Sequence, residues 1–211
     1  MNLFLLSPDH TECASWHADF HSKMILESAQ LLCSAHPPGA APYRPTHAGH
    51  PCTTWTQRSL GNYRYLVRHA RALVRDFAIR STSGVGHASG AVVEWCAANE
   101  PRLPIGGVTG FALAMPEQYR GADAFAAYRR YYLHDKQGYW RKSKTRTGLK
   151  LTWVPASWRG RNPPPWWRWL PIPTAPTVEQ MKRLKLTSLN GVAVVLPTVA
   201  DLQPLRFKET T

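Results

Sequence analysis

Apolar residues recur at helical spacing along the first two thirds of the chain. Between residues 22 and 35 they return every three or four positions, which predicts an amphipathic helix with one core-facing side. The proline and glycine residues that follow end this helix. The same spacing predicts three further helices, over residues 54–79, 92–98 and 123–139. A first helix is predicted to start at residues 7–9, where Pro8 is tolerated in the opening turn.

Three short apolar segments lack this spacing and predict β-strands: residues 1–6, as a buried first strand, and residues 149–154 and 191–196. The predicted fold class is therefore α+β, a predominantly helical single domain with a few short strands, N-terminal and C-terminal. Within it we expect a helical catalytic body over residues 1–140. Residues 141–211 form a basic C-terminal extension rich in Trp and Pro, which we expect to pack on the same domain.

Composition narrows the class of protein. A chain of 211 residues with 44% hydrophobic residues can bury one core. The formal net charge of +13 favours a polyanionic partner, nucleic acid first and an anionic membrane surface second. No apolar run reaches the roughly 18 residues that span a bilayer, so we expect no membrane partner. The four cysteines have no CxxC spacing, which argues against a zinc ribbon or a disulfide scaffold and fits a reducing cytosol.

Polar residues interrupt the apolar pattern near the N-terminus. Lys23, Glu27 and Gln30 follow one another at i, i+4 and i+7 and form one polar stripe, and His17 and His21 lie one helical turn apart. We expect these five side chains to face a common pocket.

A second polar cluster, His47 to Cys52, follows in a loop, and we expect its His50 to face the same pocket. Simpler interpretations stay open at each position. Lys23 and Glu27 can form an ordinary helix pair, and the histidines can be polar core residues. Cys52 can be a packed small side chain, or a nucleophile activated by His47 and His50.

Cations and aromatic rings are interleaved between residues 136 and 169. This segment holds nine Lys or Arg, seven Trp or Tyr and no acidic residue. Alternating cations and stacking surfaces suit single-stranded or distorted nucleic acid, although the tryptophans beside prolines can also be packing anchors. The candidate DNA-binding residues are Trp140, Arg141, Lys142, Lys144, Arg146 and Trp158.

A set of motifs in the first 140 residues carries a family resemblance. The motifs are Asn2 to Phe4, Ser7 to Asp9, Trp16 to Asp19, His21 to His36, Pro45 to His47, His50 to Cys52 with Trp55, Ser59, Asn62 to Tyr63 with Leu66, Phe111 to Ala112, Ala114 to Glu117, and Tyr128 to Arg129 with Tyr131, Tyr132 and Lys136. Together they resemble the amino acid:DNA transferases of bacteriophages that hypermodify thymidine. The residues from 141 onward match no family.

The resemblance implies a transferase that installs a free amino acid, such as glycine or serine, on the phosphorylated 5-hydroxymethyl group of deoxyuridine in phage DNA. This reaction is a step in thymidine hypermodification, which protects the viral genome from host restriction. It implies double-stranded DNA with a flipped-out target nucleotide and a free amino acid as partners, and the host cytoplasm as location. We expect no cofactor and no metal.

The reaction requires three kinds of side chain. Cations must hold the departing phosphate, a base such as His17, His21 or Glu27 must deprotonate the amine, and Lys23 or Arg129 must bind the carboxylate of the amino acid. The candidate catalytic residues are His17, His21, Lys23, Glu27, Gln30, His50 and Cys52, and the candidate substrate-binding residues are His47, Asn62, Arg129 and Lys136.

Three other functions stay open. A DNA glycosylase or lyase related to pyrimidine-dimer glycosylases would use Lys23 or the N-terminal amine as its nucleophile. A second alternative is a non-catalytic DNA-binding accessory protein. A zinc enzyme would combine His17 and His21 with a histidine of residues 47–50.

Overall fold

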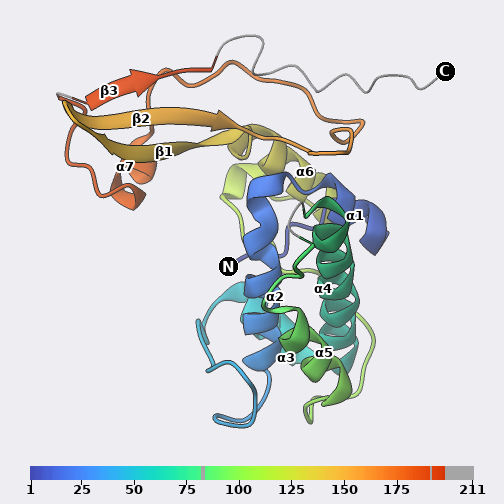
Figure 1. Cartoon of the computed structure of the whole chain (residues 1–211). Helices are drawn as coiled ribbons and strands as arrows, with labels where there is room; N and C mark the ends of the chain where they lie inside the picture. Colours follow the sequence, from blue (N-terminus) through green and yellow to red (C-terminus); the bar gives the residue numbers. More distant parts are fainter. Residues whose placement is uncertain (82–83, 191, 198–211) are drawn as a thin grey trace. The chain divides into compact units, whose positions relative to one another are not determined.

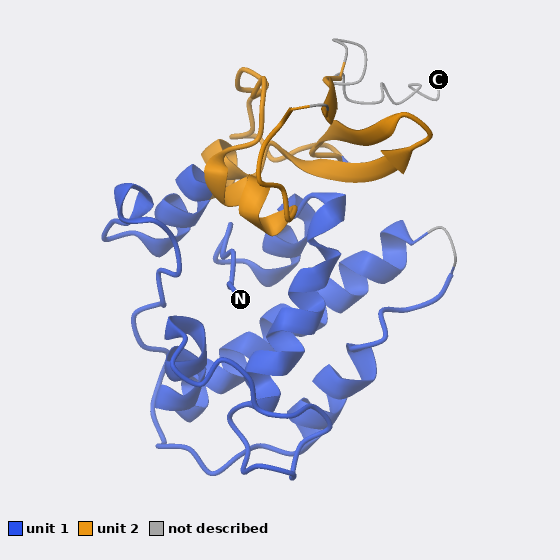
Figure 2. Cartoon of the chain, turned by 90° about the vertical axis from the view of Figure 1, so that its left-hand side faces the viewer, with its two compact units in different colours: residues 1–131, 158–161 blue, residues 132–157, 162–211 orange. Residues whose placement is uncertain are grey.

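The computed structural model describes residues 1–81, 84–190 and 192–197. This part of the chain is α+β and mostly helical, with seven α-helices and a small three-stranded sheet (Figure 1). It divides into two compact units, coloured in Figure 2. Residues 1–131 and 158–161 form the first unit, and of the described residues 132–157, 162–190 and 192–197 form the second. The boundary between the units thus falls inside a helix rather than at residue 140.

The first unit is built around one long helix, α4 (Leu60–Arg80). This helix packs against four others: α1 (His10–Trp16), α2 (Lys23–Cys33), α3 (Pro51–Arg58) and α5 (Gly90–Ala98). Short 3₁₀ helices cover Asp19–Ser22 and Glu117–Tyr119, and α6 (Ala124–Asp135) begins in this unit. Figure 1 shows α2 and α4 running side by side. None of the helices in the described ranges is long and apolar enough to cross a membrane.

Most helix predictions are confirmed, and one is wrong. The helices predicted over residues 22–35 and 92–98 correspond to α2 and α5. The continuous helix predicted over residues 54–79 is instead divided into α3 and α4 at Ser59. Ser59 has extended dihedrals, φ −153° and ψ 156°, and its hydroxyl accepts a hydrogen bond from the backbone N–H of Asn62 at 3.1 Å. Ser59 therefore caps a new helix where the apolar spacing alone predicts continuity.

The predicted N-terminal strand is not formed, although its residues are buried. Leu3 to Leu6 are at most 4% exposed, but they belong to no sheet. Side chains bind this backbone instead: His17 Nε2 lies 2.9 Å from the Phe4 carbonyl, Arg129 Nε donates to the Leu6 carbonyl at 2.6 Å, and the Leu6 N–H donates to Cys13 Sγ at 3.1 Å. Phe4 has a positive φ of 43°, so the segment is irregular, and side chains bind its buried polar groups in place of a neighbouring strand.

An ion-pair network fixes residues 158–161 to the rest of the first unit. Arg161 lies 3.1 Å from Asp19 and 3.4 Å from Asp76, and Arg80 lies 3.5 Å and 2.8 Å from the same two carboxylates. These four side chains are 6–13% exposed, whereas Arg159, which also contacts Asp19, is 65% exposed. Arg161 also donates to the backbone carbonyls of Ser15 and His17.

The second unit contains the sheet. Strands β1 (Gly138–Thr145) and β2 (Gly148–Pro155) form an antiparallel hairpin, and β3 (Val192–Val195) pairs with β2 in parallel. A short helix, α7 (Val178–Arg183), precedes β3. Trp140 lies opposite Trp153 in the hairpin, and with Leu151 these residues form a small core.

The predicted strands over residues 149–154 and 191–196 match β2 and β3, with Gly191 outside the described residues. The helix predicted to reach residue 139 ends at Asp135, because the chain enters β1 at Gly138.

Candidate functional site

Glu27 is the centre of the polar site on α2. Its Oε2 accepts a hydrogen bond from the backbone N–H of Asn2 at 3.0 Å and lies 3.9 Å from the amino group of Met1. Its Oε1 lies 3.8 Å from Lys23 Nζ, one helical turn earlier. Both cations are beyond hydrogen-bond distance, and the Glu27 side chain is 18% exposed. The carboxylate therefore keeps acceptor capacity for a ligand.

His50 lies close enough to this carboxylate to interact with it electrostatically. Burial lowers the pKa of His50, the N-terminal amino group and His47 act in the same direction, and Glu27 opposes them. His50 caps α3, and its Nδ1 accepts a hydrogen bond from the backbone N–H of Cys52 at 3.2 Å. In the neutral ring the proton is then on Nε2, so His50 can donate a hydrogen bond to an anion.

Cys52 lies in the first turn of α3, two residues after the capping His50, and is fully buried. Burial raises the pKa of the Cys52 thiol to about 12, and Glu27 acts in the same direction while the N-terminal amino group opposes it. A thiol with this pKa is protonated at neutral pH and is a poor nucleophile. The structure therefore favours the packed interpretation of Cys52 over the nucleophilic one.

The structure does not bring all five polar side chains of the N-terminal stretch to one pocket. Lys23 is exposed beside Glu27, and Gln30 is half-buried three positions after Glu27. His21 instead stacks on the ring of Phe4, with 5.0 Å between centroids, and is 3% exposed. His17 is also buried, with its ring 6.1 Å from that of His69. The common pocket predicted for His17 and His21 is therefore wrong, because both rings are packed in the interior.

The candidate substrate-binding residues occupy different environments. His47 is exposed and 6.5 Å from His50 between ring centroids. Asn62 is fully buried, and its amide bonds to the Trp55 carbonyl at 2.7 Å and to Thr109 at 2.8 Å, so these groups serve the fold, and its role in substrate binding stays a prediction. Arg129 holds the Leu6 carbonyl and covers the Trp16 ring at 5.0 Å. Lys136 belongs to the second unit and lies 3.2 Å from Asp135.

Two of the candidate DNA-binding residues are packing residues. Trp140 is 5% exposed and meets Trp153 edge to face at 5.3 Å, inside the hairpin core. Trp158 is 8% exposed, and its Nε1 donates to the Trp16 carbonyl at 2.9 Å. Neither ring is available for stacking on a base in this structure, which favours the packing interpretation that the sequence left open for the tryptophans.

The four cations of the candidate DNA-binding set, in contrast, are exposed along β1 and its turn: Arg141, Lys142, Lys144 and Arg146. Lys142 also donates to the Leu184 carbonyl.

Two features of the site were not predicted from the sequence. The first is the contribution of Met1 and Asn2, which depends on a tertiary contact that no local pattern encodes. The second is a cluster of Cys13, His17 and His69 in the core of the first unit. His10, Cys13 and His17 follow at i, i+3 and i+7, which places them on one face of a helix and is the signal that could have indicated it.

Comparisons of the chain with protein-family models, with curated proteins and with solved structures find no match.

Proposed function

We propose that the protein is a DNA-modifying transferase. It attaches a free amino acid to the phosphorylated 5-hydroxymethyl group of deoxyuridine in phage DNA. The proposal is supported by the motifs in residues 1–140 and carried by one observation: Glu27 is a partly buried carboxylate close to His50, with a cation on either side and, among the described residues, one hydrogen bond.

The reacting groups of such a transfer match these side chains. A free amino acid carries an ammonium group, which Glu27 can bind and deprotonate, and a carboxylate, which Lys23 can bind. The amine nitrogen then attacks the exocyclic methylene carbon of the base, the carbon–oxygen bond to phosphate breaks, and inorganic phosphate leaves with the bonding electrons. The Nε2–H of His50 donates a hydrogen bond to the departing phosphate.

This direct displacement needs no covalent enzyme intermediate, in agreement with the raised pKa of the buried Cys52 thiol. Cys52→Ser should therefore keep most of the turnover and lower the stability modestly. Near-complete loss of activity with intact folding and DNA binding would instead support attack of Cys52 on C6 of the base.

The test is mass spectrometry of nucleosides after the protein is incubated with phosphorylated hydroxymethyluracil DNA and a pool of amino acids. We expect a new nucleoside with a carbon–nitrogen bond at the methylene. Glu27→Gln should lower turnover by about 100-fold or more, the range for loss of an acid–base group, with DNA binding and folding unchanged. Glu94→Gln is the matched control, because Glu94 only pairs with Arg71 on the surface. Unchanged turnover in Glu27→Gln would refute the assigned role.

DNA binding is assigned to the exposed cations of β1 and its turn. Replacing Arg141, Lys144 and Arg146 with Gln should flatten the dependence of log K on log salt by roughly two to three units. Lys142 is left in place because its ammonium holds the Leu184 carbonyl. The control replaces Arg64 and Arg71, which already pair with Glu100 and Glu94, and should change the slope little. An unchanged slope in the first variant would place the DNA surface elsewhere.

A DNA glycosylase or lyase is the second candidate, because the amino group of Met1 lies 3.9 Å from Glu27. An amine beside a carboxylate can attack C1′ of the deoxyribose as the base leaves, forming an imine. Reduction with borohydride would then trap the protein on the DNA. A trapped adduct with an abasic product would replace the transferase proposal, and an accessory protein would give neither product.

A further inference from the structure

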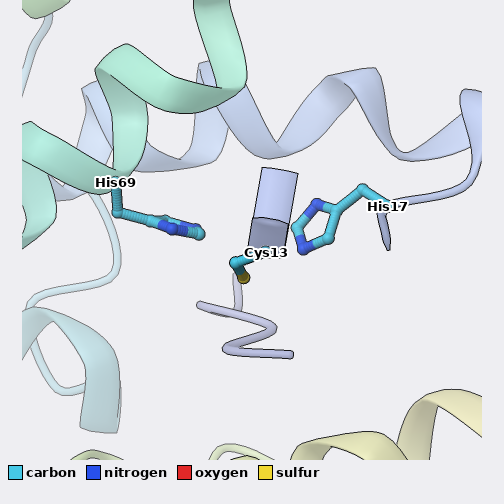
Figure 3. A group of neighbouring side chains, drawn as sticks. All are labelled: Cys13, His17 and His69. Carbon is cyan, nitrogen blue, oxygen red and sulfur yellow. The ribbon is translucent and has the colours of Figure 1, made fainter. Parts of the chain in front are cut away.

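Three metal-ligating side chains meet in the core of the first unit. Cys13 comes from α1, His17 from the residue that follows α1, and His69 from the middle of α4. Their ligand atoms all lie within 4.8 Å of one another, and Figure 3 shows the rings of His17 and His69 on either side of the Cys13 side chain. All three residues are at most 1% exposed. The cluster is thus enclosed by protein.

His69 is the unusual member of this cluster. Neither of its ring nitrogens has a hydrogen-bond partner of good geometry in the described part of the chain, and the Leu3 backbone offers only a weak contact. Buried polar groups are normally satisfied, since an unsatisfied one loses its hydration without compensation. An imidazole that is fully buried and directed at a thiol and a second imidazole requires an explanation.

The other two members are arranged as metal ligands are. His17 Nε2 lies 2.9 Å from the Phe4 carbonyl, an acceptor, so the ring proton is on Nε2 and the lone pair is on Nδ1. Metal-binding histidines regularly donate their second N–H to a carbonyl in this way. Cys13 Sγ accepts a hydrogen bond from the Leu6 backbone N–H at 3.1 Å, a contact that stabilises negative charge on sulfur.

We propose that Cys13, His17 and His69 bind one structural Zn²⁺ ion. One sulfur and two imidazole nitrogens are ligands that zinc prefers, with bonds of about 2.3 Å to sulfur and 2.0–2.1 Å to nitrogen. Tetrahedral angles at these lengths separate the ligand atoms by about 3.3–3.6 Å, so side-chain movements of about one ångström close the site. On binding, the Cys13 thiol gives its proton to solvent as the sulfur–zinc bond forms. Structural zinc is four-coordinate, so the site needs a fourth ligand, and we assign this place to His10, whose ring centroid lies 6.0 Å from that of His69.

The role is structural because the site is enclosed and no polymer substrate can reach it. Its ligands also hold the N-terminal segment: Cys13 and His17 bind the backbone of Leu6 and Phe4, and His69 crosses from α4. Zinc would thus fix the segment that presents Asn2 to Glu27. The proposed zinc set replaces the one considered from the sequence, since His21 stacks on Phe4 and His47 is exposed. The zinc proposal does not depend on the proposed transferase activity.

The experiment uses the full chain, produced in zinc-supplemented medium and purified without chelator. Elemental analysis by mass spectrometry should find about one zinc per chain. After removal of zinc, titration with Co²⁺ should give the visible bands of a tetrahedral site and a thiolate-to-cobalt charge-transfer band. Chelation should lower the melting temperature, because a ligand that binds only the folded state stabilises it.

Variants identify the ligands. Cys13→Ser should abolish the charge-transfer band, and His69→Gln should weaken Co²⁺ affinity by more than the roughly 10–100-fold that outer partners of a ligand contribute. Cys33→Ser is the matched control, because Cys33 is a buried cysteine that pairs with Cys96 instead. Circular dichroism of each variant establishes whether it is folded. If Cys13→Ser does not fold, the loss of Co²⁺ affinity in His69→Gln tests the proposal in its place. A wild-type protein without stoichiometric zinc and without a charge-transfer band would overturn the proposal, as would equal loss of the band in Cys33→Ser.

Discussion

Replacing Arg161 with Met should be among the most damaging single changes in the first unit. Arg161 is 13% exposed and contacts two carboxylates, Asp19 at 3.1 Å and Asp76 at 3.4 Å. Without it, Arg80 is left as the buried cation beside both carboxylates, and the exposed Arg159 contacts Asp19. The backbone carbonyls of Ser15 and His17 also lose a donor.

The size of the effect follows from burial. Removing one partner of a buried ion pair leaves an uncompensated charge and costs about 3–5 kcal/mol. Met keeps most of the length of the Arg stem, so lost packing contributes little. Arg159→Met is the matched control, because Arg159 contacts the same Asp19 but is 65% exposed. An exposed pair contributes only about 0–1 kcal/mol.

Urea denaturation followed by circular dichroism measures both variants against the wild type. We expect the free energy of unfolding to fall by about 3–5 kcal/mol in Arg161→Met and by less than about 1 kcal/mol in Arg159→Met. A loss below about 1 kcal/mol in Arg161→Met, equal to that of the control, would refute the reasoning, since it would mean that water already screens the network.

Three further predictions test other parts of the structure. Gly61→Ala should lower the free energy of unfolding by about 1–3 kcal/mol through overpacking, because its Cβ would lie 2.5 Å from the Gly106 carbonyl oxygen. Gly90→Ala is the control in the same denaturation assay and should be tolerated, since its Cβ would meet Val74 at 3.4 Å. Trp140→Ala should destabilise the second unit by about 3–5 kcal/mol, and loss of DNA affinity without loss of stability would restore its role in binding. Burial raises the pKa of Asp76, and Arg161 and Arg80 oppose this effect. The Asp76 carboxyl therefore stabilises the fold most below its unfolded-state pKa of about 3.9. This contribution is lost as the pH rises through the folded-state pKa. The free energy of unfolding of the wild type relative to Asp76→Asn should therefore decrease as the pH is raised from about 4, and a constant difference would contradict this.

The sequence predicts elements well where one periodicity dominates and less well where backbone hydrogen bonds decide. The apolar spacing of residues 22–35 is sufficient to place α2. It cannot reveal the division at Ser59, because a helix cap depends on one side chain bonding the backbone ahead of it. The run Leu3 to Leu6 predicts burial correctly, but a strand and an irregular buried segment have the same composition. Only the positions of Cys13, His17 and Arg129 decide between them.

The candidate site divides in the same way. The pairing of Lys23 with Glu27 follows from helical spacing, whereas the contacts of Glu27 with Asn2 and His50 require the tertiary fold. Composition predicted the tryptophans of the basic segment as stacking surfaces. Side chains alternate between the two faces of β1, so Trp140 is buried and Arg141 is exposed. The sequence did not predict this alternation because β1 was not predicted as a strand.

The first unit takes residues 158–161 from the middle of sequence that otherwise belongs to the second unit. No single cut in the chain can therefore separate the two units without damage to one of them. A fragment that stops near residue 140 would lose Trp158 and Arg161, and with them the donors to Trp16, Asp19 and Asp76. Limited proteolysis after residue 161 should leave the helical unit intact, whereas truncation before residue 158 should not. The basic segment is in this sense part of the scaffold, and it could not be exchanged between proteins as a module.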